Sequence, residues 1–212
     1  MKLANFVLAR ANESSLGVLW QTRPWVRGFI LTSLFTSLTA IAAQVSLRLP
    51  FTPVPVTGQV LMVLLAGGLL GPKLGALSQL EYLALGAAGL PIFAGYTGGL
   101  LAIAGPSGGY LFGFVAAAWI VGLLCRRQGN WLKMALGCLS GIFFIYLFGW
   151  IWLAGWLALQ KPATGVWIQA FALGVSPFIL VDVAKAMLAI PIIRAAGWKS
   201  SAACASNADT LK

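Results

Sequence analysis

Residues 176–193 read SPFILVDVAKAMLAIPII, an apolar run that carries two opposite charges, Asp182 and Lys185. The run has nearly the roughly 20 residues that a membrane-spanning helix requires. Charges in such a helix are costly and usually face the protein interior or a cavity. Residues three apart lie on one face of a helix, so these side chains can meet and offer a ligand one acceptor and one donor. An intrahelical pair that only neutralises itself is the alternative.

The composition around this run is that of an integral membrane protein with one compact domain. The chain has 212 residues, of which 60% are hydrophobic and 8% are charged, whereas soluble domains carry about 25% charged residues. The net charge is +10, but the basic residues fall between apolar segments instead of forming one stripe, so no nucleic-acid partner is expected. The chain has no His and no CxxC among its three cysteines, which predicts no metal site.

The hydropathy pattern predicts an all-α membrane protein with six transmembrane helices. We expect them at 28–47, 54–70, 74–90, 107–125, 131–159 and 177–193. With this alternation, eleven Lys and Arg residues fall on the side of both termini and only Arg48 and Lys161 on the other. Basic residues mark the cytoplasmic side, so both termini should be cytoplasmic. Residues 1–27 are then a cytoplasmic N-terminal segment, 28–196 the six-helix membrane domain and 197–212 a flexible cytoplasmic tail.

The connections predict a ligand pocket that opens outward under the outer loops. The inner connections are short, whereas the outer ones include a proline-rich stretch after Arg48 and a glycine-rich stretch after residue 90. The third outer connection is expected to contain a surface helix over 165–173. Ser176 followed by Pro177 is typical of a helix N-cap and first helical position. The alternative is that these loops only cap the helices.

Further polar side chains in the expected helices and outer loops can supply ligand contacts, although each alone could be structural. The candidate binding residues besides Asp182 and Lys185 are Gln44, Gln59, Tyr82, Thr97 and Tyr110. A small ligand with a polar head and an apolar body would suit them.

The first expected helix has two faces of small residues, one with Ser33 and Ser37 and one with Thr36 and Ala40. Small residues four apart allow another helix to approach closely. These faces either pack within the bundle or dock a partner protein.

Glu81 is the other acid of the apolar region, and it can pair with Lys73, face Lys185 or serve as a proton site. The sequence GPSGG at 105–109 lacks the GK[ST] ending of a phosphate loop, so no ATP site or other cofactor is expected in this chain. ATP-driven transport would need a separate ATPase subunit.

Five blocks of sequence resemble the BioY family: PFTPVPVTGQ (50–59), LLAGGLLGPKLGALS (64–78), YLALGAAGLPIFAG (82–95), GPSGGYLFGF (105–114) and GVSPFILVDVAK (174–185). The resemblance implies a biotin-binding S component of an energy-coupling factor (ECF) transporter in the bacterial cytoplasmic membrane, and not an enzyme. It implies that Asp182 and Lys185 belong to the biotin site. The implied partners are a transmembrane coupling protein, docked on the first helix where Ser33, Thr36, Ser37 and Ala40 lie, and two cytoplasmic ATPases.

Other functions remain open from the sequence. A solitary ion-coupled or facilitative biotin carrier would work without ATPase partners, with Glu81 or Asp182 as a proton site. An intramembrane enzyme would need Glu81 and Asp182 at similar depth, and Glu81 is expected nearer the inner side. A purely structural membrane subunit would show no stabilisation by a ligand.

Overall fold

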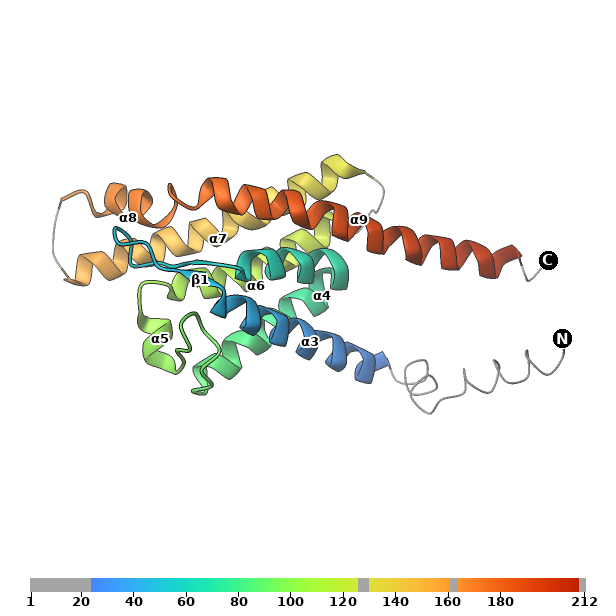
Figure 1. The fold of residues 1–212 in the computed structure, drawn as a ribbon, viewed down its shortest axis with the longest axis horizontal. Helices are drawn as coiled ribbons and strands as arrows, with labels where there is room; N and C mark the ends of the chain where they lie inside the picture. Colours follow the sequence, from blue (N-terminus) through green and yellow to red (C-terminus); the bar gives the residue numbers. More distant parts are fainter. Residues whose placement is uncertain (1–23, 126–129, 161–163, 210–212) are drawn as a thin grey trace.

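The computed structural model describes residues 24–125, 130–160 and 164–209, with side chains described through residue 196. In this part the chain is helical apart from one small hairpin and the connecting loops (Figure 1). The elements in chain order are α3 (Pro24–Gln44), β1 (Ser46–Leu47), β2 (Val56–Thr57), α4 (Gln59–Ala87), α5 (Leu100–Ala104), α6 (Gly108–Leu124), α7 (Trp131–Gln160), α8 (Val166–Gly174) and α9 (Ile179–Asp209).

Three of the described helices, α3, α4 and α7, are long and apolar enough to cross a bilayer, and α8 with α9 makes a fourth if this pair, bent by 45°, is one span. Helix α6 is apolar but has only 17 residues. The structure therefore shows a largely helical protein with three to four such spans. It does not reproduce the six expected segments one for one, because most of the second and most of the third fall within the single helix α4.

A break at Gly71 explains this difference. Gly71 has φ 80° and ψ −179°, a conformation open to glycine and not to other residues, and Pro72 follows it. A Cβ built on Gly75 would lie 2.9 Å from both the Ala66 carbonyl oxygen and the Gly67 Cα. Residues eight apart in a straight helix would be about 12 Å apart. The second half of α4 therefore bends back against the end of the first.

The core lies where α6 packs between α4 and α7, while α3 packs on α4 and α9 on both α4 and α7. Its buried side chains include Leu64, Val121, Met134 and Ile145. Large apolar side chains also cover the outer surface, as at Phe29, Leu101, Leu180 and Met187. Such a surface suits contact with lipid and not with water. The chain is thus an integral membrane protein.

The connections between the long helices build one end of the molecule. Prolines at 50, 53 and 55 prevent a helix after α3, and the chain instead forms the antiparallel pair β1–β2, with Ser46 opposite Thr57. Figure 1 shows this hairpin, α5 and α8 at one end, whereas α3 begins and α9 ends at the other. The expected surface helix at 165–173 is confirmed as α8.

The expected segment 1–27 lies largely outside the described residues. The expected tail begins at 197, but α9 continues through it to Asp209 without a break in the helix. Its flexibility stays a prediction.

We expect Gly67→Ala to lower the melting temperature of the detergent-purified protein, because a Cβ there would overlap the Ala118 carbonyl oxygen and lie 2.9 Å from the Val121 Cβ. Overpacking of this kind costs about 1–3 kcal/mol. Gly155→Ala is the matched control, since a Cβ at Gly155 of α7 meets nothing within 4 Å. Equal melting temperatures for the two variants would contradict close packing of α4 on α6.

Candidate functional site

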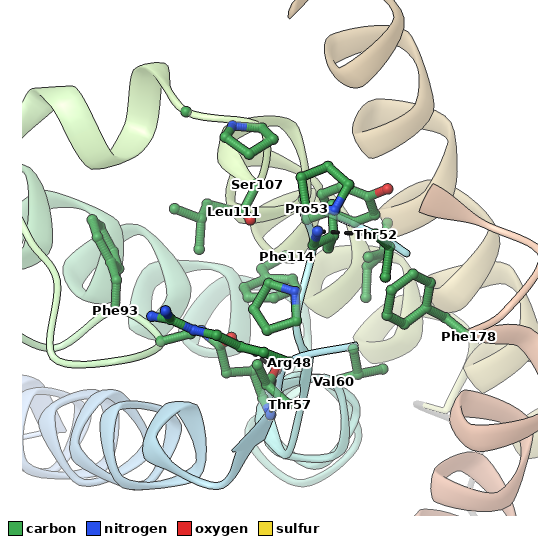
Figure 2. Close-up of a pocket in the computed structure, with 18 of the residues that line it drawn as sticks. Arg48, Thr52, Pro53, Thr57, Val60, Phe93, Ser107, Leu111, Phe114 and Phe178 are labelled. Atoms are coloured by element: carbon green, nitrogen blue, oxygen red, sulfur yellow. Dashed lines mark hydrogen bonds between the residues drawn. The ribbon is translucent and has the colours of Figure 1, made fainter. Parts of the chain in front are cut away.

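A cavity of about 500 Å³ opens among the β1–β2 hairpin, the start of α4, the α4–α5 loop, α6, α7 and α9. Its size is in the range of pockets that bind small molecules. Aromatic side chains supply much of the wall, and Figure 2 shows Phe93, Phe114 and Phe178 around it. Polar groups make up a smaller part of the wall, and several of them are joined by hydrogen bonds.

Asp182 and Lys185 both line this cavity and form an ion pair, with 2.6 Å between the Lys185 Nζ and the Asp182 Oδ1. Their side chains are 6% and 14% exposed, respectively. The Tyr146 hydroxyl of α7 donates to the second carboxylate oxygen, Oδ2, at 2.7 Å. Burial of a charge is tolerable when it is paired and hydrogen-bonded in this way.

The helix that carries the pair begins later than the sequence predicts. Ser176 and Pro177 lie in a turn over 175–178, in which the Phe178 N–H donates to the Val175 carbonyl, and α9 starts at Ile179. The prediction that Ser176 caps this helix is therefore wrong. Asp182 consequently lies in the first turn, about 4–5 Å from the helix start. The positive end of the helix dipole favours a carboxylate there.

Lys185 also binds the hairpin. Its Nζ donates to the Thr57 carbonyl oxygen at 2.6 Å, so the last residue of β2 is bonded to the charged pair of α9. The Thr57 hydroxyl donates to Gln59 Oε1, which joins this contact to the start of α4. The proline-rich outer loop is thereby attached to the polar part of the cavity.

Of the seven candidate binding residues, five line the cavity: Asp182, Lys185, Gln59, Thr97 and Tyr110. Gln44 and Tyr82 do not line it. Instead, the Tyr82 hydroxyl donates to the Ile92 carbonyl oxygen, and the Gln44 amide donates to the Ile92 and Phe93 carbonyl oxygens. Both side chains therefore lie behind the wall and hold the α4–α5 loop, which the prediction from residue type and depth alone did not anticipate.

Among the cavity residues that were not predicted to bind a ligand, Tyr146 and Arg48 bear most directly on its chemistry. Tyr146 lies in the middle of an apolar helix, and nothing in its sequence surroundings indicates what it faces. Arg48 lines the cavity with an exposed side chain that runs toward Phe93 in Figure 2. It forms no ion pair within the described part of the chain. The sequence did single out Arg48, because it is one of only two basic residues on the expected outer side.

The structure places Glu81 away from the cavity. Its carboxylate accepts a hydrogen bond from the Ser33 hydroxyl at 2.9 Å, and no ion pair joins it to Lys73 or Lys185.

Thr36 is buried and donates to the Ser78 carbonyl oxygen, so it packs within the bundle. The outward part of α3 is then the face with Ser33 and the exposed Ser37.

The cavity can accept a ligand with three chemical parts. The ion pair offers a carboxylate acceptor beside an ammonium donor, which suits a polar head with adjacent N–H and C=O groups. The aromatic walls suit an apolar body. Arg48, exposed and without an acidic partner in the described chain, suits an anionic end group.

Comparisons with known proteins agree on one family. The family model described as "BioY family" matches residues 11–202. A probable biotin transporter BioY from Pyrococcus horikoshii is 46% identical over 162 residues, which cover 76% of this chain and 91% of that protein. The biotin transporter BioY of Thermotoga maritima is 35% identical over 164 residues, covering 77% and 92%.

A solved structure has the same fold. The crystal structure of the S-component for biotin from an ECF-type ABC transporter superposes with a TM-score of 0.70 at 29% sequence identity. The match covers 82% of this chain and 92% of that one.

We expect Asp182→Asn and Lys185→Met each to lower the free energy of unfolding by about 3 kcal/mol, because each leaves a buried partner without its counterpart. The double variant should lose less free energy of unfolding than the sum of the losses in the two single variants, since it removes both members of the pair together. Thermal unfolding in detergent measures this cycle, and Lys133→Met, at an exposed lysine of α7, is the control. Strict additivity would show that the two groups do not stabilise each other.

Proposed function

The chain belongs to the BioY family, and from that membership we propose that it captures biotin and serves in its uptake across the membrane as the S component of an ECF transporter. This is a transport family, so the cavity is a binding site and not a catalytic one. The relatives named as biotin transporters and the superposed biotin S-component support the assignment.

The observation that carries this proposal is the ion pair of Asp182 and Lys185 in an otherwise mostly apolar cavity. The ureido ring of biotin presents N–H donors next to a carbonyl acceptor. Asp182 accepts one hydrogen bond on each oxygen in the described chain, and each carboxylate oxygen can accept a second. Lys185 uses two of its three N–H donors, on Asp182 and on the Thr57 carbonyl. The pair therefore has capacity left for both kinds of ureido group.

The remaining parts of biotin fit the rest of the cavity. The thiophane ring and the valerate chain are apolar and suit the walls at Phe93, Phe114 and Phe178. The carboxylate of the ligand is the natural partner of Arg48. In this arrangement the ureido head lies at the buried pair and the carboxylate at the exposed arginine.

The other candidate residues divide into two groups. Gln59, Thr97 and Tyr110 line the cavity and complete its surface. Gln44 and Tyr82 hold the α4–α5 loop in place from behind.

We further propose six spans with both termini in the cytoplasm and the cavity facing outward. The break at Gly71 supports this topology because it allows the two halves of α4 to be separate spans. The common end of α3 and α9, opposite the hairpin, α5 and α8, fits an even number of crossings (Figure 1). The excess of basic residues assigns that common end to the cytoplasm. The membrane domain would then be 28–196, in the cytoplasmic membrane of a bacterium.

The expected partners follow from the same assignment. A transmembrane coupling protein and two ATPases would supply the energy. The face of α3 with Ser33 and the exposed Ser37 is the proposed docking surface. Thr36 leaves this set because it is buried, and Ala40 leaves it because it lies on the same helical face as Thr36 and packs against the core. Lipid covers the remaining apolar surface.

Micromolar biotin should raise the melting temperature of the purified protein, since a ligand at a thousand times its dissociation constant adds about 4 kcal/mol to stability. Lipoate, which has an acid chain and no ureido ring, should give no comparable rise. Asp182→Ala should lose the biotin-dependent rise, while Lys133→Met keeps it. The proposal fails if biotin leaves the melting temperature of the native protein unchanged, or if Asp182→Ala shows the full effect.

The topology has its own test. In a chain whose native cysteines at 125, 138 and 204 are replaced by serine, we introduce Ala88→Cys at the end of α4 or Lys73→Cys just after the break. A membrane-impermeant maleimide added to intact cells should label position 88, and should label position 73 only after the cells are permeabilised. Equal labelling of both in intact cells would show that α4 does not cross as two spans.

A further inference from the structure

A strained turn lies beside the exposed end of the cavity. Gly95 and Tyr96 both have positive φ, 73° and 58°. Tyr96 is the one residue other than glycine with positive φ in the described ranges, and it is highly exposed. Such a conformation is unfavourable for a residue with a side chain and persists only where its surroundings hold it.

The surroundings that hold this turn are specific. The Tyr96 N–H donates to the Gln44 Oε1 at 3.0 Å, and the Gln44 Nε2 donates to the Phe93 carbonyl oxygen at 3.2 Å. One amide side chain at the end of α3 thus bonds both sides of the turn. The Phe93 N–H donates to the Thr97 carbonyl oxygen at 2.9 Å and closes the turn.

The turn supports Arg48. A Cβ built on Gly95 would lie 2.5 Å from the Arg48 Nη2 and 3.6 Å from its Cζ. The guanidinium therefore lies directly against the glycine, and a side chain at position 95 would displace it. Arg48 is a long, exposed side chain, and such side chains lose considerable conformational freedom when they are fixed. Contact with the turn restricts it before any ligand arrives.

We propose that the Gly95–Tyr96 turn, held by Gln44, determines specificity for ligands that end in a carboxylate, because it positions the Arg48 guanidinium at the exposed end of the cavity. Gly95 and Gln44 are positioning residues that act through Arg48. This inference rests on the proposed biotin-binding function and adds to it a residue set for one end of the ligand.

The test compares biotin with biotin methyl ester, which keeps the ureido head and the apolar body but has no negative charge. Binding of both to the purified full-length protein is measured by calorimetry. The native protein should prefer biotin by about tenfold or more, as a charge-assisted hydrogen bond provides. Arg48→Met should remove that preference and leave binding of the ester unchanged.

Gly95→Ala and Gln44→Met should lower the preference for biotin in the same way as Arg48→Met, but to a smaller extent. Each should reduce the preference for biotin at least about threefold while affinity for the ester stays within about twofold of the native value. Gly89→Ala is the matched control. It adds a Cβ at another positive-φ glycine of the same loop, with φ 105°, where nothing lies within 4 Å. It should leave the preference intact.

The outcomes separate this inference from the proposed function. If the native protein binds neither ligand, both fail. If it binds biotin and ester equally, or if Gly95→Ala retains the native preference, the role of the turn is overturned and biotin capture stands. Equal weakening of both ligands in Gly95→Ala also overturns it, because that result describes a turn needed only for the shape of the cavity.

Discussion

The burial of Asp182 and Lys185 among apolar helices is the constraint on which the rest of the structure depends. Two charges removed from water need each other and also need partners for their remaining donors and acceptors. The partners come from distant segments: Tyr146 from α7, 36 residues away, and the Thr57 carbonyl, 128 residues away. The pair is therefore satisfied only when α7, the hairpin and α9 come together. The cavity lies where they meet, so stability and ligand binding use the same groups.

Much of the helical fold and the charged pair could be predicted from sequence, because hydropathy and charge spacing depend only on residues that are close together along the chain. The bounds expected for α6 and α7 differ from the observed ones by at most one residue. The charged pair was found for the same reason, since i and i+3 positions on a helix meet whatever surrounds them. Tyr146 could not be found in this way, because its partner lies on another helix and its own neighbours along the chain are apolar.

The predictions that were wrong also have physical causes. Pro177 is compatible with a first helical position, but a turn over 175–178 delays α9 by two residues. Gln44 and Tyr82 have suitable chemistry at a suitable depth, yet the α4–α5 loop folds over them and takes their hydrogen bonds. Gly71 shows a third cause. Hydropathy reveals that residues on both sides of it are apolar and says little about the angle between them.

The bond between Lys185 and Thr57 has an evolutionary consequence. Its acceptor is a main-chain carbonyl, so almost any residue type at position 57 would provide it. Substitutions there escape selection on this contact, and an alignment would not reveal it through residue identity. Selection acts on loop length instead. Inserting or deleting one residue between β1 and β2 would shift the register of the hairpin and turn that carbonyl away from the ammonium group.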